Sequence, residues 1–257
     1  MNGDRKMQLP DRDTLGRLRD AASILVLTGA GTSAESGVPT FRDARTGLWA
    51  RYDPMDLATP EAFARDPETV WRWYQWRRQL VAAAMPNAGH HALARWQARG
   101  TAEWLLVTQN VDGLHQRAGS TGVVELHGNL QRTVCAKQRH LLDPVAESVD
   151  SPPACPRCGA PGRPDVVWFG EMLPEAALDQ AMAAAQAAEV VVSIGTSALV
   201  HPAASLPLLA LENGAMLVEI NPEPTALTAR AACALQGPAG EILPSLVRAL
   251  TGSADAD

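Results

Sequence analysis

Short apolar runs alternate with helical patterns along most of this chain, and this alternation restricts the possible folds more than any other feature. The apolar runs lie at 23–28, 103–108, 122–126, 189–194 and 215–220, with a weaker one near 232–235. Helical patterns at 87–99, 175–188 and 201–212 separate several of these runs. Continuous apolar strands joined by helices are typical of a parallel sheet covered on both faces. The pattern therefore predicts an α/β fold with a Rossmann-like, doubly wound parallel sheet.

Two stretches do not follow the alternation. Residues 35–86 are marked by Trp, Arg and Pro, which predicts helices and loops inserted after the first strand. Residues 131–164 contain three of the four Cys, with several Pro and Gly and little apolar content. Because both stretches lie between strands, we expect them to form a smaller domain together. The segments 11–34, 87–130 and 165–250 would then make up the sheet domain.

Charge and hydropathy exclude several classes of protein. The chain has 22 Lys and Arg against 28 Asp and Glu, a net charge of −6, whereas broad nucleic-acid-binding surfaces are usually strongly basic. No uninterrupted apolar stretch approaches the roughly 20 residues that cross a bilayer. The first residues are polar and contain no apolar signal region. We therefore expect a soluble, cytoplasmic protein with neither a membrane nor a nucleic-acid partner.

A glycine-rich turn, Gly29-x-Gly31-x-x-Ala34, follows the first apolar run. Such glycines let the backbone turn tightly and approach a pyrophosphate, which the following amides can bind. Small residues are also common in turns after strands that bind no nucleotide, so this motif alone leaves both interpretations open. A dehydrogenase would next show a second strand ending in an acidic residue. A Pro-containing loop at 36–43 follows instead, which disfavours a hydride-transferring enzyme.

Four more polar or glycine-rich segments follow predicted strands, at 108–115, 125–129, 195–197 and 219–223. Each of them could be a plain turn or helix cap. However, ligands of open α/β sheets bind outside the carboxyl ends of the strands, so together the segments point to one shared crevice. Within them, His127 could accept a proton from a hydroxyl group near neutral pH. A lone His is more often structural, and its place among polar strand ends favours function.

These motifs resemble those of the sirtuin family of NAD-dependent protein lysine deacylases, in particular its bacterial class III subgroup. The matching segments are GAGTSAESGVPTFRD (29–43), TQNVDGLHQRAG (108–119), ELHGN (125–129), VVWFGEMLP (166–174), GTSALVHPAA (195–204) and EINPEPT (219–225). They occur in family order and span nearly the whole chain. The resemblance implies NAD as cofactor, acyl-lysine proteins as substrates, and nicotinamide, O-acyl-ADP-ribose and free lysine as products. It also implies that the sheet domain binds NAD, and that 35–86 and 131–164 are a helical cofactor-loop insertion and a zinc-ribbon-like module.

The roles of individual residues are implied by the resemblance. The implied cofactor-binding residues are Gly29, Ala30, Gly31, Thr32, Phe41, Arg42, Gln109, Asn110, Asp112, Gly195, Thr196, Ser197, Asn221, Glu223 and Ala239. His127 would be the general base, and Asn110 and Asp112 would order the ribose and the nicotinamide. The implied substrate edge, which pairs with the peptide as an added strand, contains Val166, Val167, Phe169 and Gly170.

Tyr74 and Arg77 bear on the choice of acyl group. They lie three positions apart, so they share one face of a helix. The pair matches the Tyr-x-x-Arg of sirtuins that remove succinyl, malonyl and related acidic groups, and the planar guanidinium of Arg suits a carboxylate. The alternative is an aromatic helix that packs on the small domain, with its Arg in solvent. We expect removal of acetyl and of succinyl or malonyl groups.

The Cys cluster departs from the family pattern of two C-x-x-C pairs, which suits tetrahedral zinc. Cys155 and Cys158 form the second pair, but the first pair has only Cys135, with Gln138 in place of the other Cys. His140 could supply the fourth ligand at an unusual spacing. Water could complete the site, or the module could hold no metal at all.

Two other functional classes remain open from the sequence. A protein ADP-ribosyltransferase would use the same NAD chemistry with a different acceptor. A non-catalytic NAD-sensing module would have less need of His127 together with Asn110 and Asp112. Nicotinamide release that requires an acyl peptide would separate the deacylase from both.

Overall fold

A six-stranded parallel sheet is the centre of the protein. The computed structural model describes residues 9–38, 53–100, 102–142 and 150–252 of the 257-residue chain. The strands are β1 (Ser23–Thr28), β2 (Glu103–Thr108), β3 (Val124–Glu125), β6 (Val190–Ile194), β7 (Met216–Asn221) and β8 (Cys233–Gln236), in the spatial order β3-β2-β1-β6-β7-β8. The order reverses direction between β1 and β6, as in doubly wound folds. The predicted fold class is therefore confirmed.

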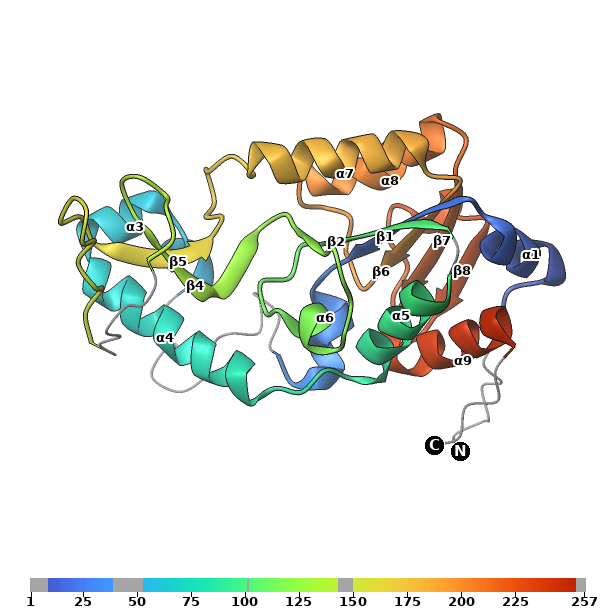
Figure 1. Ribbon diagram of the computed structural model, residues 1–257, viewed down its shortest axis with the longest axis horizontal. Coiled ribbons are helices and arrows are strands. Elements are labelled where there is room, and N and C mark those ends of the chain that lie inside the picture. The colour runs from blue at the N-terminus through green and yellow to red at the C-terminus, as the bar shows by residue number, and fades with distance from the viewer. Residues whose placement is uncertain (1–8, 39–52, 101, 143–149, 253–257) are drawn as a thin grey trace.

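Helices cover both faces of the sheet (Figure 1). One face packs against α1 (Arg12–Asp20), α5 (Ala88–Arg99) and α9 (Ala239–Thr251), and the other against α7 (Glu175–Ala187) and α8 (Leu206–Glu212). Strand β6 shows why the apolar runs are continuous. Val190 and Val192 lie in the core beneath the first group of helices, whereas Val191 points into the core beneath the second. Successive strand residues face opposite sides, so both sides must be apolar.

A smaller body lies at the far end of the molecule from α1 (Figure 1). It consists of α2 (Pro54–Leu57), α3 (Pro60–Arg65), α4 (Pro67–Ala83) and the antiparallel pair β4 (Gly128–Cys135) and β5 (Gly162–Val166). These elements share a separate core that includes Phe63, Trp73 and Leu130. Buried Arg78 of α4 donates to the carbonyl oxygens of Leu130 and Arg132, at 2.6 and 2.8 Å. The helices and the hairpin are thereby joined through backbone groups of β4.

Some predicted elements have different bounds in the structure. The run at 122–126 forms only the two-residue strand β3. Gly122 has a positive φ of 61°, so the extended backbone can begin only after this residue. The helical pattern at 201–212 begins as a 3₁₀ turn, Ala203–Ser205, and becomes α8 only at Leu206. Pro207 lies in the first turn of α8, where its missing N–H costs no hydrogen bond. Within the described ranges, the longest helices are too short or too polar to cross a membrane.

Candidate functional site

The glycine-rich turn after β1 lies directly against the turn after β6. A Cβ atom on Gly29 would lie 2.8 Å from Thr196 Cβ, and one on Gly31 would lie 2.8 Å from Gly195 Cα. Gly195 itself has a positive φ of 60°, which L side chains rarely adopt. Residues Ala30–Ser36 then form a 3₁₀ helix, and the Gly31 amide donates to the Gly195 carbonyl at 2.8 Å. The two turns therefore need glycine, and their backbones meet where the strand order reverses.

Polar side chains from the segment after β2 contact the same turn. Asn110 donates to the Gly29 carbonyl and to Ser33 Oγ, both at 3.1 Å. Ser33 in turn donates to Asp112 Oδ2 at 2.7 Å. Burial raises the pKa of Asp112, although the amide of Leu114 and the Ser33 hydroxyl, which donate to its carboxylate, act in the opposite direction. The structure thus brings the predicted Asn110 and Asp112 together with the glycine turn.

Ser33 and His90 also belong to this network, although neither was predicted as a site residue. His90 Nδ1 accepts the Asn87 amide at 3.3 Å, so Nε2 carries the proton and lies 3.4 Å from Ser33 Oγ. Asn87 and His90 form the capping box at the start of α5, and Asn87 also donates to the Thr32 carbonyl at 2.8 Å. The Asn-x-x-His spacing could have indicated the helix cap from sequence, but only the fold shows that His90 lies against Ser33.

A second buried histidine lies beside the first. The His90 and His115 rings have centroids 4.8 Å apart, and His115 Nε2 is 2.9 Å from Thr28 Oγ1. Burial lowers the pKa of His90 to about 4 and that of His115 to about 3. Both imidazoles are therefore neutral near pH 7 and act as hydrogen-bonding groups inside the protein.

His127 is half-buried in the segment between β3 and β4. Its Nδ1 lies 2.9 Å from the carbonyl oxygen of Gln109, which can only accept, so Nδ1 carries the proton. The lone pair of the neutral ring is consequently on Nε2. Burial lowers the pKa of His127 below its usual 6.5, against the opposing effect of the Gln109 hydrogen bond. An imidazole in this state can accept a proton from a hydroxyl group at neutral pH.

The remaining predicted cofactor residues extend along the carboxyl ends of β6 and β7. Thr196 accepts from Gln109 Nε2 at 3.2 Å, and its carbonyl accepts from Asn221 Nδ2 at 3.0 Å. Buried Ala239 begins α9, whereas Ser197 and Glu223 lie in exposed loops. The predicted Phe41 and Arg42 lie outside the described residues.

The predicted substrate edge follows β5 and runs beside His127. The Val167 amide donates to the His127 carbonyl at 2.9 Å, and the Phe169 amide donates to the Ala58 carbonyl at 3.0 Å. Val166 is buried and Phe169 is 40% exposed, as expected for an extended segment with one inner and one outer face. Gly170 then turns the chain with a positive φ of 85°.

Tyr74 and Arg77 share one face of α4, as the spacing predicted. Tyr74 is buried, and its hydroxyl oxygen accepts the indole N–H of Trp168 at 2.9 Å. The Arg77 guanidinium carbon is 5.8 Å from the Tyr74 ring centroid and 5.0 Å from that of Trp73. Arg77 thus lies half-buried against aromatic rings and is not extended into solvent.

The three clustered Cys lie close together beyond β4. The sulfur atoms of Cys135, Cys155 and Cys158 are all within 4.8 Å of one another. The turn after Cys135 folds back on itself, since the Cys135 amide donates to the His140 carbonyl at 3.0 Å. His140 Nε2 consequently lies 3.3 Å from Cys155 Sγ, whereas Gln138 is exposed. Sulfur and imidazole ligands at such distances fit zinc after small adjustments.

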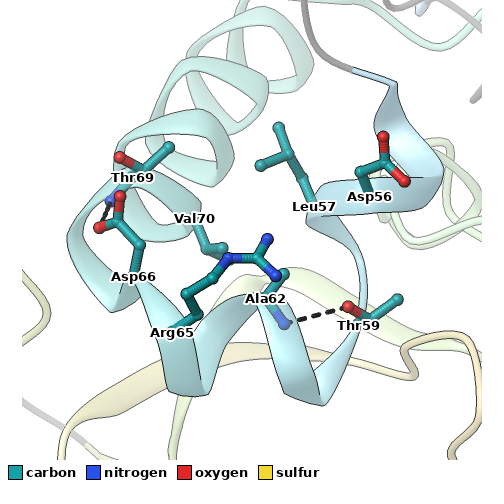
Figure 2. Close-up of a pocket in the computed structure, with 8 residues that line it drawn as sticks. All are labelled: Asp56, Leu57, Thr59, Ala62, Arg65, Asp66, Thr69 and Val70. Atoms are coloured by element: carbon teal, nitrogen blue, oxygen red, sulfur yellow. Dashed lines mark hydrogen bonds between the residues drawn. The ribbon is translucent and has the colours of Figure 1, made fainter.

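A pocket of about 580 Å³ lies between α2, α3 and the start of α4, apart from these groups (Figure 2). It is lined by Asp56, Leu57, Thr59, Ala62, Arg65, Asp66, Thr69 and Val70. Thr59 and Asp66 use their side chains to cap α3 and α4, by accepting the amides of Ala62 and Thr69. These capping roles account for two of the polar lining residues.

The fold and the strand-end groups are those of a nucleotide-binding α/β protein, and a neutral imidazole and the extended segment at 166–170 lie beside them. The Sir2 family model matches residues 29–202, more than half of the chain. The chain therefore belongs to the Sir2 family.

Relatives and solved structures agree with this assignment. The chain is 52% identical over 239 residues to NAD-dependent protein deacylase 1 of Pseudomonas aeruginosa, covering 90% of this chain and 95% of the relative. It is 55% identical over 215 residues to NAD-dependent protein deacylase of Thermus thermophilus, covering 82% and 84%. The crystal structure of a Sir2 homologue with NAD matches with a TM-score of 0.88 and 47% identity, over 94% of each chain. A Sir2 complex with a p53 peptide and NAD matches with a TM-score of 0.82 and 31% identity, over 95% of this chain and all of that one.

Proposed function

We propose that this protein is an NAD-dependent lysine deacylase, which transfers the acyl group of a modified lysine to ADP-ribose and releases nicotinamide. The observation that carries the proposal is the position of His127. The Nδ1 atom of His127 is held by the Gln109 carbonyl in the segment after β2, which leaves Nε2 free to accept a proton. The backbone carbonyl of His127 accepts a hydrogen bond from the amide of Val167 in the predicted substrate edge. His127 therefore contacts the predicted cofactor crevice through its imidazole and the predicted peptide edge through its backbone carbonyl. The names of the relatives support this activity.

The residues at the strand ends fit NAD. Gly29, Gly31 and Gly195 let the two turns pack backbone against backbone, so the 3₁₀ helix Ala30–Ser36 starts at the carboxyl edge of the sheet, where a pyrophosphate would bind. Asn110 and Asp112 are held in fixed orientations and would order the ribose and the carboxamide of nicotinamide. Thr196 and Asn221, joined by a hydrogen bond, would flank the adenosine half. Bound NAD supplies a ribose carbon whose bond to nicotinamide is broken in the reaction.

The chain's own groups then carry out the proton transfer. His127 Nε2 accepts the proton of a ribose hydroxyl, while the Gln109 carbonyl holds the Nδ1 proton and stabilises the imidazolium that forms. With NAD bound, removal of this proton by His127 would make the hydroxyl oxygen a nucleophile toward the acyl carbon, and one water consumed in the reaction would release the free lysine. The edge at 166–170 holds the peptide backbone, so the acyl-lysine enters from the side of His127.

A nicotinamide-release assay with a panel of acetyl and succinyl peptides tests the proposal. We expect release that depends on an acyl peptide and produces free lysine in equal amount. His127→Ala should lower deacylation by about 10²–10⁴-fold and keep NAD binding, as measured by calorimetry. His91→Gln, on the exposed face of α5, is the control that should leave both unchanged. Nicotinamide release without a peptide, or full turnover by His127→Ala, would contradict the proposal.

We further propose that acidic acyl groups, succinyl or malonyl, are accepted through Tyr74 and Arg77. The Trp168 hydrogen bond ties Tyr74 to the substrate edge, so the pair lies next to the segment that would hold the peptide. Burial raises the pKa of Tyr74 to about 12, which keeps the phenol protonated as a donor. A guanidinium and a phenol together can bind the two oxygens of one carboxylate.

We also propose a structural zinc ion bound by Cys135, Cys155, Cys158 and His140. The three sulfur atoms already lie within 4.8 Å of one another, and His140 is next to Cys155.

The proposal extends to the organisation of the chain: 35–86 and 131–164 form the small domain, and the remaining segments form the NAD-binding domain. Since the four Cys are unpaired, they fit a reducing compartment, and we assign the protein to the cytoplasm.

A further inference from the structure

Trp168 connects the substrate edge to the residues proposed to choose the acyl group. It follows Val167, whose amide binds the carbonyl of His127. Its indole Nε1 donates to the Tyr74 hydroxyl at 2.9 Å, across 94 residues of sequence. Trp168 and Tyr74 are each only 2% exposed, so water does not compete for this hydrogen bond.

The direction of this hydrogen bond fixes where the Tyr74 proton goes. An indole N–H can only donate, whereas a phenolic hydroxyl can donate and accept. The Tyr74 oxygen must therefore accept from Trp168, and its own hydrogen is directed away from the indole. Without the indole N–H, the hydroxyl could rotate and lose this orientation.

Trp168 is itself held on several sides. The Arg163 guanidinium carbon lies 3.3 Å from the Trp168 ring centroid, and the Phe63 ring centroid is 5.2 Å away. Arg163 makes a two-point contact with Glu171, at 2.5 and 2.8 Å. Glu171 also accepts the backbone amide of Trp168 at 2.8 Å. The Arg163 guanidinium over the ring and the Glu171 carboxylate at the backbone amide together hold the Trp168 indole in one orientation.

We propose that Trp168 is a positioning residue for acidic acyl groups, which fixes the Tyr74 hydroxyl so that its hydrogen points at the acyl carboxylate beside Arg77. The inference rests on the proposed acceptance of succinyl or malonyl groups and explains how α4 is set relative to the substrate edge. Arg77 supplies the charge, 5.8 Å from the Tyr74 ring centroid, and Tyr74 supplies a neutral donor. An acetyl group has no carboxylate, so it gains nothing from this arrangement.

Trp168→Phe tests the role, because it keeps an aromatic ring and removes the N–H. We expect kcat/KM for a succinyl peptide to fall about three- to tenfold, chiefly through a higher KM, the effect of losing one oriented hydrogen bond. The value for the acetyl peptide should stay within about twofold of wild type. Trp104→Phe removes a buried indole N–H at a distance from the substrate edge and should change neither substrate.

A double-mutant cycle separates positioning from a general structural effect. In a Tyr74→Phe background, Trp168→Phe should have no further effect on the succinyl peptide, since the hydroxyl that it orients is gone. Equal losses on both peptides, or the same loss with and without Tyr74, would overturn the role of Trp168. A wild-type protein that does not accept the succinyl peptide would instead contradict the acidic-acyl proposal, and this role with it. Acetyl turnover by each variant reports that the site has folded.

Discussion

The imidazole of His127 has its tautomer set by one backbone carbonyl, and this makes its pH dependence predictable. Deacylation needs the neutral ring, and burial lowers its pKa below 6.5, so the base remains available in mildly acidic solution. We expect the decrease of kcat/KM toward low pH to be centred below pH 6.5. Rate profiles between pH 5 and pH 8 measure this limb, with His91→Gln as the control. An acid limb centred above pH 7 would contradict the assignment.

Arg77 should affect acidic substrates selectively. Arg77→Met keeps an unbranched apolar side chain against Trp73 but removes the charge. We expect kcat/KM for a succinyl peptide to fall at least about tenfold, because a charge-assisted hydrogen bond contributes about 1.5–3 kcal/mol. Acetyl-peptide turnover should change little or rise. Comparable losses on both peptides would show that Arg77 only packs on Trp73.

At the scale of elements, the turn after β4 shows how the metal module adapts to the missing Cys. Arg139 has a positive φ of 58°, which a non-Gly residue adopts at some cost in free energy. This conformation folds the turn so that His140 pairs with Cys135 and reaches Cys155. A ligand two positions later than the usual Cys can therefore reach the sulfur atom of Cys155.

Metal analysis tests this module directly. We expect one zinc ion per chain in the purified protein, most of it lost in Cys155→Ser and part of it lost in His140→Ala. His140→Cys should retain zinc, since a thiolate is also a good ligand. Cys233→Ser, in β8 and away from the cluster, is the control and should keep the full zinc content. Zinc-free wild-type protein would show that packing alone holds the module.

The elements that could be predicted from sequence are those whose local pattern reflects their surroundings. Strand β6 has both faces buried and reads as a continuous apolar run, so its position was evident. The contact between Trp168 and Tyr74 could not be predicted from sequence, because Tyr74 lies 94 residues earlier and only the packing of α4 on β5 brings the two side chains together. The contact between His90 and His115 was missed for the same reason. Motif residues at strand ends were found because parallel strands share one edge.

At the scale of the whole molecule, the two buried histidines link folding to pH. In the unfolded chain both titrate near 6.5, whereas in the folded protein the pKa is about 4 for His90 and about 3 for His115. Below pH 6.5 the unfolded state therefore binds more protons, and the free energy of unfolding falls as the pH falls. Between pH 6.5 and pH 4 the loss is on the order of 2 kcal/mol for each histidine.

Urea unfolding at a series of pH values measures this dependence. We expect stability to decrease steadily from pH 6.5 to pH 4, and His115→Gln to flatten the curve by removing one of the two groups, even if it lowers stability at pH 7. His91→Gln, on the exposed face of the same helix as His90, should change the slope only slightly, because the charge of His91 lowers the pKa of His90 less than burial does. A wild-type curve that is level down to pH 4 would show that the histidines do not stay neutral inside the fold. Because His90 lies 3.4 Å from Ser33 Oγ, which donates to Asp112, binding of NAD should follow the same acid limit as folding.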